Sequence, residues 1–349
     1  MKHYIGLDVS MKETSICIVN EKGKVVYEGK EKTDPSLLTH HLKNKNLKIE
    51  KIAMESGSLS HYLISEMQKL GLSVTCVDAR QMSKVLSVKV NKTDRNDARG
   101  IAEALRSGYY REVALKSQKN VETSTVLGSR RMLVQQKVSL KNGIRGFLKT
   151  YGICVPVKGK RCFLQKVRDV LEEQPSYIQK SVEALLTSFE KLDSEIIGLE
   201  KMIKELAKDD EDVKLLITIP GVGIITALSF KVAIDDPSRF QDSRNVGAYL
   251  GMTPKQYSSG ETHRQGGISK CGNPAVRSLL VEAGTVMLTR TKVWCKPKAW
   301  AFKLARKKGT KKAAVALGRK LGVIMHRMLV TREKFRLGDP EEEQGKKAA

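Results

Sequence analysis

The chain has 349 residues, with 63 Lys and Arg against 38 Asp and Glu, which gives a formal net charge of +25. This length predicts two domains rather than one small module, and the charge favours a polyanionic partner. Hydrophobic residues make up 40% of the chain, so a disordered basic protein is excluded. No signal peptide and no membrane span is expected, and the six cysteines lack the spacing of a zinc site, which suits a reducing cytoplasm.

The first part of the chain predicts a mixed α/β sheet. Short β-branched runs at residues 4–9, 14–19 and 25–27 are typical of a three-stranded meander. A helix, a strand, a second helix and a further strand follow at residues 35–43, 49–54, 59–70 and 73–77, and helices continue from about residue 80 to 106. This is the order of a ribonuclease-H-like domain, although strand order alone also allows another α/β sandwich.

The middle of the chain predicts long helices. Residues 123–150 are helical and basic, and after a break near residue 155 apolar residues recur at alternating steps of 4 and 3. Such a heptad seam indicates either a long helix packed on its own domain or a coiled coil that joins two copies as a homodimer or tetramer. The seam consists of Ile178, Val182, Leu185, Phe189, Leu192, Ile196, Leu199, Ile203 and Leu206.

The second half opens with two apolar helical segments around Pro220, Gly221 and Gly223, a helix-hairpin-helix-like pattern in a mostly α-helical domain. Gly221 and Gly223 would let the turn approach a phosphate, and the next helix would offer free N–H groups. An ordinary connection between two helices is the alternative. We therefore predict domains at residues 1–155, 156–208 (a helical coiled-coil connector) and 209–336, with a disordered tail at 337–349.

The last helices are strongly basic. From residue 290 to 336 there are 16 Lys or Arg and one acid, Glu333, a net charge of 16 − 1 = +15. Alternating basic and apolar residues predict helices with one core face and one cationic face, and so one-sided a charge favours contact with a nucleic-acid backbone over a merely solvated face. The basic candidates are Lys307, Lys308, Lys311, Lys312, Arg319 and Lys320.

Four acids form a candidate metal site. Asp8 lies in the first apolar strand, where a charge needs compensation, and Glu55 ends the strand at 49–54. Adjacent first and fourth strands would bring these two carboxylates together, and Asp94 and Asp97 would share one helix face. Such a cluster suits Mg²⁺ or Mn²⁺. Singly, Asp94 is also a plausible helix N-cap and Glu55 a surface residue.

Six short motifs follow one another along about 330 residues of the chain. They are Gly6-Leu7-Asp8-Val9-Ser10, Met54-Glu55-Ser56-Gly57, Lys92-Thr93-Asp94-Arg95-Asn96-Asp97-Ala98, Ile219-Pro220-Gly221-Val222-Gly223, Tyr249-Leu250-Gly251-Met252-Thr253-Pro254 and Ile268-Ser269-Lys270-Cys271-Gly272-Asn273. The combination of Lys-Thr-Asp-x-x-Asp with the later motifs is specific. In this order the motifs resemble the DEDD transposases of bacterial insertion sequences, which are related to Piv-type DNA invertases and include bridge-RNA-guided recombinases.

The resemblance implies a RuvC-like N-terminal domain with the acidic tetrad Asp8, Glu55, Asp94 and Asp97. It also implies a C-terminal transposase domain whose serine attacks a DNA phosphate to form a covalent phosphoserine. We assign that serine to Ser259, which directly precedes a glycine, with Ser258 and Ser269 as alternatives. A flexible loop around it would place Arg264 and Lys270 near the phosphate.

The same resemblance implies double-stranded DNA partners at the element ends and the target, a guide RNA, and action at the nucleoid in the bacterial cytoplasm. The residues alone leave other functions open. A junction-resolvase-like nuclease would use the same acids with water as nucleophile. A nucleic-acid-binding protein without chemistry and a sugar-kinase-like or actin-like ATPase are further alternatives. The aromatic content of 5% gives little sign of base stacking.

Overall fold

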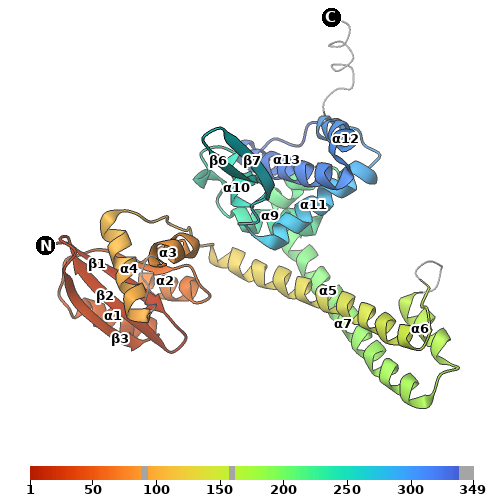
Figure 1. Ribbon diagram of the computed structural model, residues 1–349, viewed down its shortest axis with the longest axis horizontal. Coiled ribbons are helices and arrows are strands. Elements are labelled where there is room, and N and C mark those ends of the chain that lie inside the picture. Colours follow the sequence, from red (N-terminus) through yellow and green to blue (C-terminus); the bar gives the residue numbers. More distant parts are fainter. Residues whose placement is uncertain (88–92, 157–161, 338–349) are drawn as a thin grey trace, which may run out of the picture. The chain divides into compact units, whose positions relative to one another are not determined.

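The computed structural model describes residues 1–87, 93–156 and 162–337. The chain forms two compact units, Met1–Lys116 and Ser117–Ala349 (Figure 1). This division differs from the predicted boundary near residue 155, because the helix at residues 118–150 packs on the helix at residues 176–208 and so belongs to the second unit. The predicted tail lies almost wholly outside the described residues. No described helix is both long and apolar enough to cross a bilayer.

The first unit contains a five-stranded sheet with the order β3-β2-β1-β4-β5. The predicted meander is confirmed, since β1–β2 and β2–β3 are antiparallel, whereas β1–β4 and β4–β5 are parallel. The adjacency of the first and fourth strands is confirmed as well. The strands are β1 (His3–Val9), β2 (Glu13–Asn20), β3 (Val25–Lys32), β4 (Ile49–Glu55) and β5 (Thr75–Val77).

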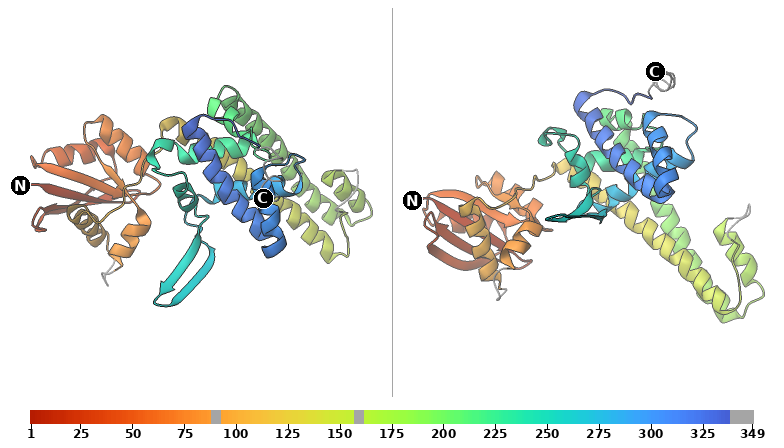
Figure 2. Two further views of the ribbon diagram at one scale, coloured as in Figure 1. Left: turned by 90° about the horizontal axis from the view of Figure 1, so that it is seen from above. Right: turned by 45° about the horizontal axis from the view of Figure 1, so that its top comes forward.

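Helices cover both faces of this sheet (Figure 2). Ile5 and Leu7 of β1 pack with α1 and α2 in one core, while Cys17 and Val19 of β2 pack with α4 on the other face. The alternation of side chains along each strand produces these two cores. The helices are α1 (Pro35–Lys43), α2 (Ser60–Lys69), α3 (Ala79–Leu86) and α4 (Asp94–Ser107).

The second unit begins with two long antiparallel helices, α5 (Gln118–Thr150) and α7 (Ser176–Lys208). The heptad seam of α7 packs on α5 of the same chain, with Ile178 and Val182 against Ile144 and Leu148. The seam is therefore used within one chain, as in the first of the two predicted alternatives. It also drifts, because an α-helix has 3.6 rather than 3.5 residues per turn: Leu206 is exposed and Ala207 is buried instead.

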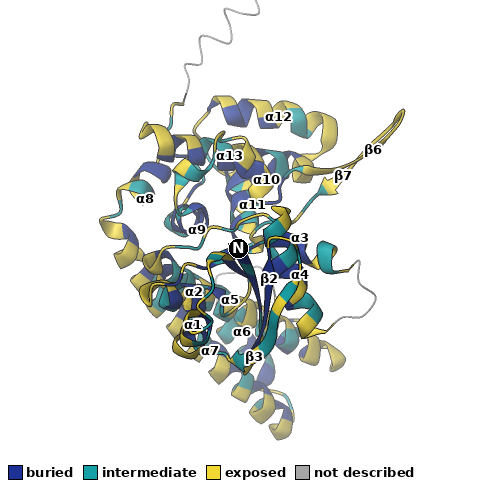
Figure 3. Ribbon diagram, turned by 90° about the vertical axis from the view of Figure 1, so that its left-hand side faces the viewer, coloured by how far each residue is buried: buried dark blue, intermediate teal, exposed yellow. Residues whose placement is uncertain are grey.

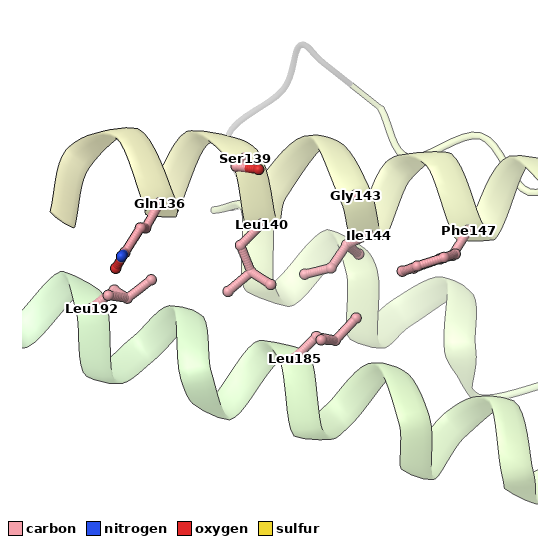
Figure 4. A pocket seen from close by; sticks show the side chains of 8 residues that line it. All are labelled: Gln136, Ser139, Leu140, Gly143, Ile144, Phe147, Leu185 and Leu192. Atoms are coloured by element: carbon pink, nitrogen blue, oxygen red, sulfur yellow. The ribbon is translucent and has the colours of Figure 1, made fainter. Parts of the chain in front are cut away.

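Ion pairs fix the register of these two helices. Arg130 donates to Glu200 Oε1 from Nε at 3.0 Å and from Nη2 at 2.6 Å, and Lys137 pairs with Asp193. Between the helices lies an apolar hollow of about 390 Å³ (Figure 4). It is lined by Gln136, Ser139, Leu140, Gly143, Ile144, Phe147, Leu185 and Leu192.

Helix α6 (Phe163–Leu171) packs with α5 and α7, and the helices after α7 form the main core of the second unit, from which a β-hairpin extends. These helices are α8 (Glu211–Leu216), α9 (Ile224–Ile234), the 3-10 helix η1 (Pro237–Arg239), α10 (Asn245–Tyr249), α11 (Pro274–Thr289), α12 (Lys296–Lys308) and α13 (Thr310–Thr331). The hairpin consists of β6 (Pro254–Ser259) and β7 (Thr262–Ile268). We expected a flexible glycine-rich loop here; the segment is instead two paired strands.

Glycines let α11 and α13 approach closely. A Cβ on Gly284 would lie 2.7 Å from the Ala314 carbonyl oxygen, and one on Gly318 would lie 2.8 Å from that of Leu280. Both neighbours are backbone atoms, so the helices must separate to admit a methyl group.

We expect Gly284→Ala to lower the free energy of unfolding by about 1–3 kcal/mol, the usual cost of overpacking a core. Gly198→Ala on the exposed face of α7, where nothing lies within 4 Å of the added Cβ, should raise it by up to about 1 kcal/mol. Urea denaturation of both variants checks the pair. Equal effects would contradict the packing role of Gly284.

A half-buried charge network joins α8, α9 and the end of α13. Lys231 Nζ lies 2.5 Å from Asp210 Oδ2 and 3.0 Å from Asp212 Oδ2, and Arg332 also pairs with Asp212. Burial opposes ionisation of Asp212, but hydrogen bonds from Lys231 and Arg332 outweigh it and hold its pKa below the ordinary 3.8.

Because the pKa of Asp212 is lower in the folded chain than in the unfolded chain, its stabilising effect is complete above pH 3.8 and is lost as the pH falls through the lowered value. We expect the urea midpoint of the second unit to fall in this acid range. Asp212→Asn should be less stable near neutral pH and should lose less on acidification. Glu333→Gln, which removes an exposed pair with Arg336, serves as the control and should leave the pH profile unchanged.

Candidate active site

The structure places the four predicted acids toward the same end of the sheet, on the face covered by α4. Asp8 and Glu55 directly follow Leu7 and Met54, which are register partners in the parallel pair β1–β4. Asp8 lies two residues after Gly6, so both are on the face covered by α4. A Cβ on Gly6 would lie 2.1 Å from the Ala98 carbonyl oxygen. Gly6 therefore lets the start of α4 approach β1 beside Asp8.

The two acids of α4 share one face of the helix but lie toward different strands of the sheet. Asp94 lies one turn before Ala98, which packs on β2, while Asp97 lies one turn before Ile101, which packs with Ala53 of β4. Thr93 caps the helix by accepting from Asn96 N at 3.3 Å. The predicted capping role for Asp94 is therefore filled by Thr93, and both acids lie in the first turn, where the helix dipole favours negative charge.

A basic residue also reaches this group. Asp8 is the register partner of Ser15 in the antiparallel pair β1–β2, and Ser15 is the register partner of Lys30 in β2–β3. Lys30 Nζ lies 3.8 Å from Asp94 Oδ2, so one cross-strand row links the end of β1 to the first turn of α4. Asp8, Glu55 and Asp97 are partly buried, whereas Asp94 is exposed.

Carboxylate oxygens are the donors that Mg²⁺ and Mn²⁺ prefer. Within residues 1–87, 93–156 and 162–337, however, no three His, Cys, Asp or Glu side chains are grouped closely enough to hold a metal ion. The backbone therefore places the four acids toward the same end of the sheet without grouping their carboxylates, and carboxylates are donors that suit a hard divalent cation.

The candidate serines lie on or beside the β6–β7 hairpin, which is exposed along almost its whole length (Figure 3). Gly260, with φ of 52°, opens the two-residue turn between Ser259 and Thr262. Ser259 and Thr262 are register partners at the tip, as are Tyr257 and Arg264 further down. Because alternate residues of a strand share a face, Ser259 and Arg264 lie on the same face of the hairpin.

Ser258 lies on the opposite face with His263, its register partner. The Ser258 Oγ and His263 Nδ1 atoms are 3.0 Å apart and hydrogen-bonded. Ser269 lies at the base, partly buried, where its N–H donates to the Thr253 carbonyl oxygen at 2.8 Å. The three candidate serines therefore occupy three different places: one face of the tip, the other face, and the base.

The base of the hairpin is firmly built from two of the sequence motifs. Lys270, with φ of 59°, donates its N–H to the Gly251 carbonyl oxygen at 2.9 Å. Arg277 Nη1 donates to the Leu250 and Gly272 carbonyl oxygens, each at 3.1 Å. A Cβ on Gly251 would lie 2.4 Å from the Cys271 nitrogen, so the two backbones touch. Hydrogen bonds and backbone contacts therefore fix the base of the hairpin, whereas its tip is exposed.

The remaining nucleic-acid candidates divide into two groups. Gly221, with φ of 89°, packs its Cα against α11, where a Cβ would lie 2.9 Å from the Ala283 carbonyl oxygen. Its conformation therefore serves helix packing, while Gly223 is open and caps α9. The basic candidates of α12 and α13 are all exposed, and none forms an ion pair with another described residue: Lys307, Lys308, Lys311, Lys312, Arg319 and Lys320.

Two family models match the chain. One, described as a transposase of the DEDD IS110 type, covers residues 5–153, and one described as the transposase IS116/IS110/IS902 family covers residues 213–299. The chain is 30% identical over 339 residues to the transposase for insertion sequence element IS1111A of Coxiella burnetii, which covers 96% of this chain and 91% of that protein. The chain belongs to this family of DEDD transposases.

Other relatives agree with this assignment. The transposase for insertion sequence element IS1328 of Yersinia enterocolitica is 31% identical over 68% of this chain and 71% of its own length. The pilin gene-inverting protein of Moraxella bovis is 25% identical over 80% of this chain and 81% of its own. Membership implies an enzyme of DNA recombination, which acts by phosphoryl transfer. The first family model continues into α5 and so extends beyond the compact unit that ends at Lys116.

Proposed function

We propose that this transposase cuts, exchanges and rejoins double-stranded DNA through a covalent phosphoserine at Ser259. The observation that carries the proposal is the position of Ser259 at the exposed tip of a hairpin, on the same face as Arg264. A guanidinium on that face can hold a backbone phosphate by paired hydrogen bonds while the hydroxyl attacks it. The anchored base fixes the direction in which the tip is presented.

The chemistry balances without an external energy source. The Ser259 Oγ–P bond forms as one P–O bond to a deoxyribose breaks, and the proton lost by the serine ends on the leaving oxygen. A free hydroxyl of another strand then attacks the phosphoserine and releases Ser259. Each step replaces one phosphate ester by another, so strands are rejoined without ATP.

The N-terminal unit supplies the acids of the proposed mechanism. We propose that Asp8, Glu55, Asp94 and Asp97 of a ribonuclease-H-like fold hold Mg²⁺ or Mn²⁺. When bound, such ions stabilise the charge on the attacked phosphate and on the leaving oxygen. The support is their common position at one end of the sheet. We assign metal binding to residues 1–155, the helical connection to residues 156–208 and the serine nucleophile to residues 209–336.

The proposal includes further partners. Recombination joins two DNA sites, so we propose a dimer or tetramer in which the α5–α7 pair contributes contacts, since Phe147 and Ile197 on these helices are exposed. The exposed lysines and arginines of α12 and α13 bind the DNA backbone. A noncoding guide RNA that selects the target completes the proposal, with action on nucleoid DNA in the bacterial cytoplasm.

The test is a strand-joining assay. The protein is expressed with the noncoding DNA that flanks its gene, co-purified RNA is sequenced, and element-end and target DNA are incubated with Mg²⁺ in the absence of ATP. We expect joined products and one enriched RNA species. Cleaved ends that are never joined would contradict the proposal and indicate a hydrolytic nuclease instead.

A further inference from the structure

Two aromatic rings form an exposed pair at the start of α12. Trp294, just before the helix, and Phe302, within it, stack with ring centroids 5.5 Å apart and an interplanar angle of 29°. Trp294 is 53% exposed and Phe302 is 38% exposed. Covering this exposed aromatic surface would be favourable, because apolar surface is removed from water. Exposed apolar surface of this kind often marks a binding site.

A buried lysine lies near both rings of the pair. Lys298 is only 6% exposed, and its Nζ donates to the Thr291 carbonyl oxygen at 2.5 Å. The same Nζ lies 5.6 Å from the centroid of Trp294 and 6.0 Å from that of Phe302. A cation fixed near both rings favours one ring orientation. The aromatic surface is therefore preorganised, which lowers the entropy cost of binding.

The charge around the pair selects the kind of partner. Lys292, Lys303 and Arg306 are exposed and lie within four residues of Trp294 or Phe302 in the sequence, and no Asp or Glu occurs between Glu282 and Glu333. An anionic partner that offers a flat apolar face to the rings would complement both features. Unpaired nucleotides meet both requirements, since every base has a face that can stack and every linkage carries a charge. The bases of an intact duplex are already stacked and cannot reach the rings.

We propose that the Trp294–Phe302 pair binds an unpaired nucleobase of single-stranded RNA or DNA by stacking, with the neighbouring basic side chains on its phosphates. The site deepens the nucleic-acid binding of the proposed function and does not depend on Ser259 or on the acids. It also changes the expectation from composition: aromatic residues are few, but both tryptophans of the chain are exposed on one basic segment.

The test compares affinities of the full chain for labelled oligonucleotides of about ten nucleotides, a length within the usual range of single-strand sites. Oligo(dT), oligo(rU) and a duplex are measured by fluorescence anisotropy at one salt concentration. We expect Trp294→Ala to weaken single-strand binding about tenfold, the scale of one lost stack, and to leave duplex binding unchanged. Trp294→Phe should retain most of the affinity.

Trp300→Ala is the matched control. Trp300 is 39% exposed on the same helix, but Lys320 Nζ lies over one face of its ring, 4.6 Å from the centroid. We expect no more than about a twofold change, within the scatter of exposed cation–π contacts. Equal losses in both variants, equal losses for single strand and duplex, or no loss at all would overturn the proposal.

The two single-stranded probes identify the source of the nucleotide. A loss in Trp294→Ala that is confined to oligo(rU) assigns the site to RNA, and a loss confined to oligo(dT) assigns it to DNA; either supports the site. Repeating the series in Ser259→Ala separates this inference from the proposed function. The single-strand effect should persist there even though no covalent intermediate can form.

Discussion

We expect the replacement of Ser259 by alanine to remove the covalent protein–DNA adduct and to lower strand joining by about 10⁴-fold or more, the scale on which loss of a nucleophile acts in serine-dependent enzymes. In the proposed mechanism the serine Oγ atom forms the bond to phosphorus, and the methyl group of alanine cannot do so. The assay is denaturing electrophoresis of the protein after incubation with end-labelled DNA and Mg²⁺. Binding of the same DNA should be almost unchanged, because one small exposed hydroxyl is lost.

Ser258→Ala provides the matched control for this result. Ser258 and Ser259 are neighbours on β6 but lie on opposite faces of the hairpin, and Ser258 is hydrogen-bonded to His263. We expect Ser258→Ala to retain the adduct, with a change in rate of less than about tenfold, the scale of one surface hydrogen bond. An adduct that persists in Ser259→Ala and disappears in Ser258→Ala would move the nucleophile to the face that carries His263.

Replacing Asp8 by asparagine should lower DNA cleavage and adduct formation by about 10³-fold, comparable to the loss of one main electrostatic stabiliser in an active site. Asparagine keeps the size of the side chain and removes the charge that would hold a divalent cation. The fold should remain, since the core of β1 is formed by Ile5 and Leu7. Cleavage rates across a Mg²⁺ titration check this expectation, and thermal unfolding checks the fold.

Strand β4 offers a matched pair of variants for the same question. Glu55 ends this strand beside Asp8, whereas Glu50 lies near its other end and pairs with Lys2 at 2.9 Å. We expect Glu55→Gln to behave like Asp8→Asn and Glu50→Gln to behave like the unchanged chain. Full activity of Glu55→Gln would contradict an acidic site at this end of the sheet.

The placement of the four N-terminal acids toward one end of the sheet could be predicted from sequence because its signals are local. A charge within the apolar run of β1, an acid at the end of β4 and two acids three residues apart each define a position on one element. The order of strands then places the elements side by side. The role of Gly6 could not be predicted, because it depends on which helix backbone lies above β1.

The C-terminal part was less predictable for physical reasons. The hairpin contains few β-branched residues and is exposed, so hydrophobic alternation does not mark its strands. Gly221 has the sequence of a phosphate-binding turn, yet its close neighbour is the backbone of α11. The heptad seam of α7 could be predicted from the sequence. The helix on which it packs could not, because periodicity does not distinguish α5 of the same chain from a second copy.

The most direct test of the central claim is to locate the phosphorylated residue in the adduct. Trypsin cleaves after Lys or Arg, so Ser258 and Ser259 fall in the peptide from Gln256 to Arg264, whereas Ser269 falls in the peptide from Gln265 to Lys270. After nuclease digestion of the DNA, mass spectrometry should find the nucleotide remnant on the first peptide, with fragmentation that assigns it to Ser259. A remnant on Ser269, or no modified peptide despite DNA cleavage, would contradict the account.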